Sequence, residues 1–559
     1  MTLTRKIQTA SRRFTWRIFL ALREQPNTLP ENKRNASCQS LTADHGWPTA
    51  NRRQPIADRV RASVRRTLIF LELAAFRIMT PIVLPSASQI AAQIRDKEIS
   101  PVEVARTHLD RIGRLNPALN AFVDYHPELI LEQARSAEAA IQRGDSLGPL
   151  HGVPLSIKSS MDVAHHRCEA GSRLRAGYIP NQDAPVVARL RAAGAIILGV
   201  TNAPEYLMAW ETDNLLYGRT NNPYDLTRTA GGSSGGESAA IASGMSAGGL
   251  GSDGGGSIRV PAHFCGICGL KPTPGRISSA GHFPKSGGPF ATIGVVGPMA
   301  RTVKDLQLLF GVMASWDEGD TRDGDPSSAP VPVRNLEEKE VASTRIAFFV
   351  DDAQTPVTKE TQEAVTKAAS LLSNAGFHVD NFRPDGLEEA RNLWWDYFGI
   401  AGGMILNREL RGRESELSPI LQEFLSWTLA APPHSGDSLL DAWLSRDTLR
   451  EKVLAQMRQH PVLICPVAAV PAFRHGEREW QIDGKTVKYL EAWSYCEWFN
   501  LLGFPAVVVP VSYSPEGLPI GVQIIGRAWQ EELVLAIAAR LEKVRGPWSE
   551  EKSAKTVLT

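Results

Sequence analysis

The sequence predicts an α/β protein, in which helices cover a sheet of buried strands. Amphipathic helical segments alternate along the chain with short apolar runs, such as residues 194–199, which follow a predicted helix over 186–193. Strands that are buried on both faces have continuous apolar sequences of this kind, whereas half-exposed strands alternate apolar and polar residues. With 559 residues, 43% of them apolar and 22% charged, the chain is long enough to bury a large core.

The first clear elements follow residue 86. We predict a strand over residues 121–123 and amphipathic helices over residues 88–96, 101–115 and 129–143. Ser100 in the N-cap position and Pro101 in the first turn mark the start of the second helix. We expect this helix to end at Asn116-Pro117, because proline disrupts a helix interior.

The alternation continues to the C-terminus. An apolar run before Lys158 predicts a buried strand that carries this lysine at its end. Residues 500–510 and 518–526 predict paired strands, residues 385–460 are largely helical in pattern, and the polar residues 316–344 predict a surface connection. The other expected elements are helices over 303–313, 359–375 and 531–544, strands over 345–350 and 463–466, and strands with loops over 270–277 and 293–299.

A glycine- and serine-rich stretch, residues 231–269, is expected to form a shaped loop. A flexible linker would be polar throughout, whereas here a helix-forming run at residues 238–242 separates two glycine clusters. Asp253, Arg259 and Pro261 each stand at a single defined position in the stretch. Because glycine permits positive φ and close backbone approach, this density of glycines indicates a tightly folded site.

The same stretch contains candidate catalytic groups. Ser257 follows three glycines, whose bare backbone N–H groups could stabilise an oxyanion. A serine is a poor nucleophile at its ordinary pKa and needs a base. Burial lowers the pKa of a lysine from about 10.4 toward neutrality. Lys158 could therefore act as that base, and Ser233 and Ser234 supply further hydroxyls.

These residues resemble the amidase signature family of serine hydrolases. The matching motifs are G-V-P-x-x-x-K at 152–158, G-G-S-S-G-G at 231–236, G-S-D-x-G-G-S-I-R-x-P at 251–261 and F-C-G-I-C-G-L-K-P-T at 264–273. The spacings also agree, with 75 positions from Lys158 to Ser233 and 24 from Ser233 to Ser257. Within the family, Glu237 and the F-C-G-I-C segment are most similar to the fatty acid amide hydrolase branch. The resemblance covers about residues 84–545.

The resemblance implies a catalytic triad. Ser257 is expected to be the acyl-forming nucleophile, Ser233 the bridging serine on a cis peptide bond, and Lys158 the base. At the position of Leu207, the fatty acid amide hydrolase branch contacts its substrate through the backbone.

The resemblance also implies an oxyanion hole. Its donors are expected to be the backbone N–H groups of Gly254, Gly255, Gly256 and Ser257. Ser234, Asp253 and Arg259 are expected to support the site. Position 254 departs from the family pattern, which usually has a larger residue there, often Thr or Ile.

A single catalytic domain is implied, with a central mixed twisted β-sheet covered by helices on both faces, and with no cofactor or metal in the site. The expected reaction is hydrolysis of a carboxylic amide, with a fatty acyl amide as one option, to an acid and an amine or ammonia. Two alternatives remain open: a glutaminase similar to the A subunit of glutamyl-tRNA(Gln) amidotransferase, and a non-catalytic binding protein on the same fold. The expected partner is a small-molecule amide, and a homodimer is compatible with the resemblance. The net charge of +1 gives no reason to expect nucleic acid binding.

Six cysteines are present, without the spacing of a disulfide framework. Cys265-x-x-Cys268 could suggest a zinc or redox site, but no second motif of this kind follows it. The pair lies among apolar residues. We therefore expect packed, reduced thiols and a reducing compartment.

Residues 1–80 differ from the rest, with 15 Lys or Arg against 5 Asp or Glu. Three interpretations stay open: a basic segment in weak contact with a membrane surface, a transit-like peptide, or an upstream start with the working chain beginning near Met79. Residues 67–76 are too short an apolar run to span a bilayer, which takes about 20 residues, and no secretory signal is evident. We expect a cytoplasmic protein with a basic extension over 1–83, a catalytic domain over 84–545 and a tail over 546–559.

Overall fold

The computed structural model describes residues 85–285, 287–314, 329 and 331–548. The predictions for the N-terminal extension, for Cys38 and for most of the C-terminal tail lie outside these residues. Residues 316–328 and 330 of the predicted surface connection over 316–344 also lie outside them.

An 11-stranded mixed sheet forms the centre of the described fold, in the order β1-β3-β2-β6-β8-β7-β14-β15-β11-β9-β10. Its β2 pairs in parallel with β3 and β6, and β6 pairs antiparallel with β8. The expected mixed sheet is therefore confirmed. The strands are β1 Phe122–Asp124, β2 Pro154–Lys158, β3 Ile196–Thr201, β6 Gly248–Asp253, β7 Cys268–Lys271, β8 Val295–Ala300, β9 Arg345–Phe348, β10 His378–Asn381, β11 Val462–Pro466, β14 Ala506–Tyr513 and β15 Pro519–Gly526.

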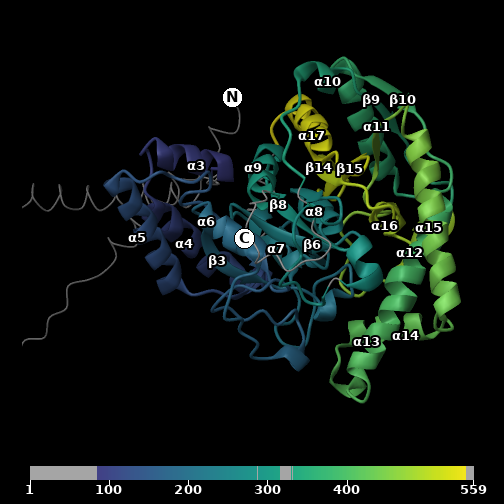
Figure 1. Cartoon of the computed structure of the whole chain (residues 1–559), viewed down its shortest axis with the longest axis horizontal. Helices are drawn as coiled ribbons and strands as arrows, with labels where there is room; N and C mark the ends of the chain where they lie inside the picture. The colour runs from purple at the N-terminus through teal and green to yellow at the C-terminus, as the bar shows by residue number, and fades with distance from the viewer. Residues whose placement is uncertain (1–84, 286, 315–328, 330, 549–559) are drawn as a thin grey trace, which may run out of the picture. The chain divides into compact units, whose positions relative to one another are not determined.

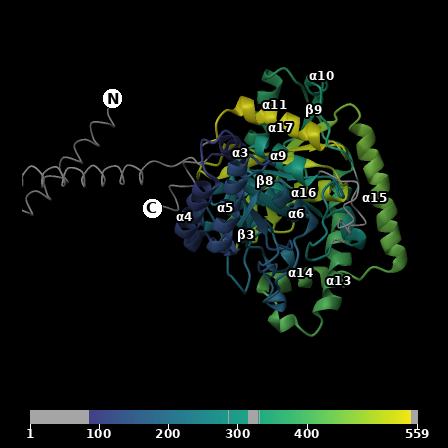
Figure 2. The same cartoon turned by 60° about the vertical axis from the view of Figure 1, so that its left-hand side comes forward.

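Helices cover both faces of the sheet (Figures 1 and 2). Successive residues of β3 show this, because Ile196 and Leu198 belong to one apolar cluster and Ile197 to another. The helices packed on the face of Ile197 are α3 Ala87–Arg95, α6 Pro185–Ala192, α9 Val303–Met313, α10 Glu338–Ala342, α11 Lys359–Asn374 and α17 Glu531–Arg545. Those on the face of Ile196 are α4 Pro101–Leu119, α5 Pro127–Arg143, α7 Gly235–Ala242, α8 Arg259–Cys265, α12 Leu387–Trp395, α15 Gly436–Gln456 and α16 Ser494–Leu501.

A smaller helical group lies at one end of this arrangement, below α12 and α15 in Figure 1. It contains α13 Gly402–Leu410 and α14 Pro419–Leu429, which share a third apolar cluster with Tyr206. The predicted helical region 385–460 is confirmed. The short elements are the helical turns η1 Arg173–Arg175, η2 Glu205–Leu207, η3 Gly288–Thr292, η5 Asp396–Ala401 and η6 Glu414–Glu416, and the hairpins of β4 Asn221–Asn222 with β5 Asp225–Thr229 and of β12 Glu479–Ile482 with β13 Lys485–Lys488.

The predicted end of α4 at Asn116-Pro117 is wrong. The helix continues to Leu119 with Pro117 inside it. A proline this close to the C-terminal end of a helix removes few of the helix's backbone hydrogen bonds. The Asn116 side chain also orders the exit, because its Oδ1 accepts the N–H groups of Ala121 and Phe122 at 2.9 and 2.8 Å. The predicted start at Ser100 is confirmed as a capping box.

The predicted strand over 500–510 is wrong in its first part. Asn500 belongs to α16, which ends at Leu501, and the strand begins only at Ala506. A buried apolar run fits a helix or a strand equally well. Here the buried Asn500 side chain donates to Asp253 Oδ1 at 3.0 Å from the last turn of α16.

Within the described residues, no helix combines the length and the apolarity that crossing a membrane requires.

Candidate active site

Lys158 occupies the end of β2 and is fully buried. Its Nζ donates to Ser233 Oγ at 2.7 Å and to Ser252 Oγ at 2.9 Å. Burial lowers the pKa of Lys158 to about 7, although the negative charges of Asp253 and Glu237 oppose the shift. Near neutral pH a large fraction of this amine is therefore uncharged and able to accept a proton.

Ser233 follows a cis peptide bond between Gly232 and Ser233, just before α7 begins. The chain packs closely here, since a Cβ on Gly232 would lie 2.6 Å from backbone atoms of Glu211. Ser234 Oγ donates to the Ser252 carbonyl at 3.3 Å, and Ser234 N–H donates to the Ser257 carbonyl at 3.1 Å. The double serine thus joins the turn after β6 to the start of α7.

Ser257 follows β6 and the three glycines, and it lines a cavity of about 600 Å³ together with Ser233 and Ser252. Among the residues that the structure describes, its hydroxyl has no hydrogen-bond partner. The structure therefore brings Lys158, Ser233 and Ser257 to one location, with the first two directly bonded.

The carboxylate of Asp253 organises the glycine turn. It accepts the N–H groups of Gly256 at 2.7 Å and Ile258 at 3.1 Å, and Arg259 Nε at 3.0 Å. Burial alone would raise the pKa of Asp253, but the Arg259 guanidinium outweighs it and holds the pKa well below its usual range. Asp253 and Arg259 form a fully buried ion pair directly behind the turn.

Two indoles bind the other side of the turn. Trp394 Nε1 donates to the Gly254 carbonyl and Trp210 Nε1 to the Gly255 carbonyl, each at 2.8 Å. The Gly256 N–H is occupied by Asp253, in contrast to the expectation that it faces an oxyanion. The N–H groups of Gly254, Gly255 and Ser257 have no acceptor in the described part of the chain, so three of the four expected donors are free.

The small residue at position 254 has a structural reason. A Cβ on Gly254 would lie 3.1 Å from the ring of Phe398, which belongs to η5 and stacks on Trp394 at a centroid distance of 4.7 Å. An aromatic side chain from a distant segment therefore occupies the space that the family's larger residue would need. Phe398 also lines the cavity.

The walls of the cavity are mainly apolar. Leu207, predicted to contact substrate, lines it with a positive φ of 66°. Four charged residues, Arg175, Asp253, Lys285 and Glu409, also line it. The other apolar wall residues include Met208, Phe283, Phe290, Val295, Ile405 and Leu406.

Several residues of the site were not predicted from the sequence. Ser252, the second partner of Lys158, stands within the G-S-D motif, where no pattern distinguishes it from the neighbouring serines. Glu237 is fully buried, where it accepts hydrogen bonds from Ser156 and Thr201, and burial raises its pKa to about 8. The indoles of Trp210 and Trp394 gave no sequence signal, because a tryptophan in an apolar segment is usually core.

The thiols of Cys265 and Cys268 are packed in the interior, as predicted. Both are fully buried, and burial raises the pKa of each well above its ordinary value. Their Sγ atoms donate to different backbone carbonyls, those of Ala230 and Arg301.

Comparison with known proteins places this site in a family. The amidase family matches residues 103–535. The chain is 34% identical over 483 residues to the A subunit of glutamyl-tRNA(Gln) amidotransferase of Synechococcus sp. (strain JA-2-3B'a(2-13)), covering 81% of this chain and 90% of that one. It is 31% identical to "Acylamidase" of Rhodococcus erythropolis, covering 85% and 98%. A solved structure, "Fatty acid amide hydrolase", superimposes with a TM-score of 0.76 at 27% identity, covering 85% of this chain and 88% of that chain. The chain therefore belongs to the amidase signature family of enzymes that act on carbon–nitrogen amide bonds.

Proposed function

We propose that this enzyme hydrolyses a carboxylic amide through an acyl-enzyme on Ser257, using Ser233 and Lys158 to move protons. The observation that carries the proposal is the 2.7 Å hydrogen bond between the buried Lys158 amine and Ser233, in a cavity that Ser257 also lines. A lysine in this setting can serve as a general base only because burial brings its pKa to about 7.

The proposed reaction begins when neutral Lys158 takes the proton of Ser233 while Ser233 takes that of Ser257. Ser257 Oγ then bonds to the amide carbon, and the carbonyl oxygen becomes an oxyanion facing the N–H groups of Gly254, Gly255 and Ser257. As the carbon–nitrogen bond breaks, Ser233 returns a proton to the leaving amine and is reprotonated by Lys158. Water then hydrolyses the ester and frees the acid. Removing one such oxyanion donor typically costs about 3–4 kcal/mol in the barrier.

We propose an amide with an apolar acyl or aryl group as the substrate. The cavity of about 600 Å³ has the size of a small-molecule site, and its walls carry phenylalanine, leucine and methionine side chains. The names of the similar proteins, an acylamidase and a fatty acid amide hydrolase, support this class. A panel of amides from acetamide to long-chain acyl and aryl amides measures the preference. Rising kcat/KM with acyl size supports the proposal, whereas a preference for acetamide contradicts it.

A second candidate is a glutaminase that delivers ammonia to another protein. The 34% identity to the A subunit of a glutamyl-tRNA(Gln) amidotransferase favours it. Glutamine is a small, polar zwitterion, so it would leave the apolar walls largely unused. Glutaminase activity, or co-purification with a stoichiometric protein partner, would replace the first proposal with this one. A homodimer stays a prediction.

A fluorophosphonate probe tests the nucleophile directly. We expect the intact chain to be labelled on Ser257, and peptide mass mapping identifies the modified residue. Ser257→Ala should abolish labelling, whereas Ser343→Ala, at an exposed serine far along the chain, should not change it. Labelling elsewhere, or none in a folded protein, contradicts the acyl-enzyme and favours a binding protein on this fold.

A further inference from the structure

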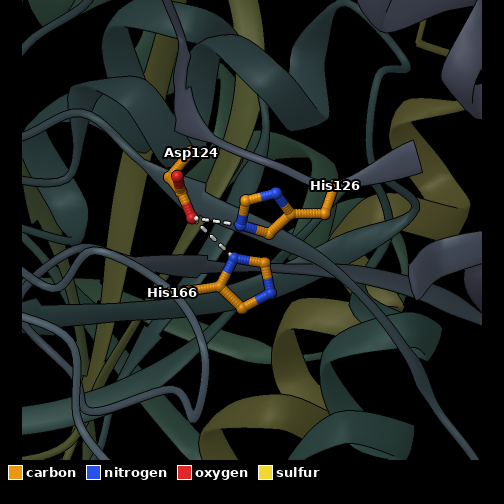
Figure 3. A group of neighbouring side chains, drawn as sticks. All are labelled: Asp124, His126 and His166. Carbon is orange, nitrogen blue, oxygen red and sulfur yellow. Dashed lines mark hydrogen bonds and ion pairs between the residues drawn. The ribbon is translucent and has the colours of Figure 1, made fainter. Parts of the chain in front are cut away.

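A group of three side chains of metal-ligating types lies outside the predicted active site. Asp124, His126 and His166 meet with their polar atoms facing one another (Figure 3). Asp124 Oδ2 lies 2.9 Å from His166 Nδ1 and 3.2 Å from His126 Nε2. One carboxylate oxygen and the two ring nitrogens all lie within 4.8 Å of one another.

Two segments of the chain supply these residues. Asp124 is the last residue of the edge strand β1, and His126 precedes the first residue of α5. The His126 side chain makes no capping hydrogen bond to that helix, so the helix start does not account for its position. His166 comes from the loop that follows β2, eight residues after Lys158. The group therefore joins the edge of the sheet to the loop that leaves the lysine strand.

We propose that Asp124, His126 and His166 bind one divalent transition-metal ion, with Zn²⁺ as the ion of choice. Two imidazole nitrogens and one carboxylate oxygen match the ligand types of zinc, whereas Mg²⁺ and Ca²⁺ prefer oxygen ligands throughout. With three protein ligands, water completes a tetrahedral zinc site. No metal was predicted from the sequence, and this proposal departs from that prediction.

Two of the three separations between ligand atoms are close to those of a tetrahedral zinc site. Zinc lies about 2.0–2.2 Å from nitrogen and oxygen ligands, which separates tetrahedral ligands by roughly 3.3–3.5 Å. The observed 2.9 and 3.2 Å are a few tenths of an ångström shorter. His166 Nδ1 is hydrogen-bonded to the carboxylate, and His126 Nε2 lies at ion-pair distance from it. On binding, each imidazole carries a proton only on the ring nitrogen that faces away, and a proton on the nitrogen that binds the ion is released to water, so no oxidant or reductant is needed.

Burial makes the site partly preformed and still accessible. The side chains of His166 and Asp124 are 4% and 10% exposed, so two ligands are held in place by packing. The His126 side chain is 44% exposed and supplies an open side through which an ion and its water can enter. Because the ion would connect β1, α5 and the loop after β2, we expect its role to be structural stabilisation of that loop.

Zinc titration of the full chain tests the site. We expect one Zn²⁺ per chain in isothermal titration, with a rise in Tm on addition of ZnCl₂. His126→Gln alters an exposed side chain and should fold normally, and Asp124→Asn keeps the shape of the carboxylate. Each should weaken zinc binding by more than about a hundredfold, since even losing an outer partner of a ligand costs 10–100-fold. Co²⁺ in place of Zn²⁺ should give a tetrahedral visible spectrum that both variants lose.

His165→Asn is the matched control. His165 is the exposed neighbour of His166, and asparagine tolerates its positive φ of 68°. We expect this variant to bind Zn²⁺ as the unchanged chain does. Two outcomes overturn the proposal: no zinc bound at a concentration well above micromolar, or zinc bound equally by the unchanged chain and by both ligand variants. The second outcome would locate the ion elsewhere in the chain.

Discussion

The amine of Lys158 lies 2.7 Å from the hydroxyl oxygen of Ser233, and its second hydrogen bond is to Ser252. Both partners are neutral hydroxyls, and in the described part of the chain no carboxylate lies within ion-pair distance of the amine. A buried lysine with a close carboxylate would stay charged. Here burial dominates and the pKa falls to about 7, which is the condition for a lysine base.

The rate should therefore follow the titration of Lys158. We expect kcat/KM for an uncharged amide to rise with pH, with an apparent pKa near 7, because only the uncharged amine accepts the proton of Ser233. A pH profile between 5 and 9 measures it. Lys271 is also buried with a pKa of about 7 but bonds to the Pro272 carbonyl, so Lys271→Met should keep the rising limb. A flat profile would contradict the role of Lys158.

Stability should depend on pH through the same group. The pKa of Lys158 is 10.5 as a free side chain and about 7 in the fold, so between these values the unfolded chain binds more protons. The free energy of unfolding therefore rises with pH across this window, by at most about 1.4 kcal/mol per pH unit. Lys158→Met removes this dependence. Between pH 7 and pH 10, urea unfolding should show a larger increase in the free energy of unfolding for the unchanged chain than for the variant. If the difference in the free energy of unfolding between the two proteins is the same at both pH values, burial of the amine is contradicted.

Ser257→Ala should abolish turnover and leave the fold unchanged. Loss of a triad nucleophile lowers kcat by about 10³-fold or more. The Ser257 hydroxyl has no partner among the described residues, so its removal should change the free energy of unfolding by less than about 0.5 kcal/mol. Steady-state kinetics and a melting curve on one preparation measure both. Retained activity would remove Ser257 from the mechanism.

Gly255→Ala should damage both rate and stability. Its Cβ would overlap the Trp394 ring, which is 1% exposed and has no room to move. We expect a loss of about 1–3 kcal/mol from overpacking and a fall in kcat as the neighbouring N–H groups shift. Gly311→Ala is the control, because a Cβ there, within α9, meets nothing within 4 Å. It should be neutral or stabilising.

Asp253→Asn should be strongly destabilising, because it leaves the fully buried Arg259 without its counter-charge. Breaking one side of a buried pair costs about 3–5 kcal/mol. Asp145→Asn removes a partner from the exposed pair with Arg143 and should cost less than about 1 kcal/mol. Chemical denaturation of the two variants makes the comparison, and equal losses would contradict the importance of the buried pair.

Local motifs predicted residues that the structure brings to one location. Lys158, Ser233 and Ser257 each stand in a dense motif, and the resemblance to the amidase signature family identified them, while their catalytic roles stay predictions. The course of α4 past Pro117 and the helical turn at Asn500 were not predictable in this way. The first depends on a hydrogen bond between the Asn116 side chain and the backbone that leaves the helix. The second depends on a hydrogen bond between Asn500 and Asp253, which is distant in the sequence. The same reason hid Trp394, Phe398 and the pairing of Asp124 with His166, which are contacts between remote segments.

The indole of Trp394 binds the Gly254 carbonyl, and this contact has a consequence for how such an enzyme can change its substrate. In a planar trans peptide the carbonyl and the next N–H point in opposite directions, so holding the oxygen of Gly254 also aims the N–H of Gly255. Trp394 leads directly into η5, whose Phe398 forms part of the cavity wall. Mutations that reshape this wall for a new acyl group will therefore also reorient the backbone N–H of Gly255, which is an expected oxyanion donor. Substrate selectivity and turnover should for this reason evolve together in this region.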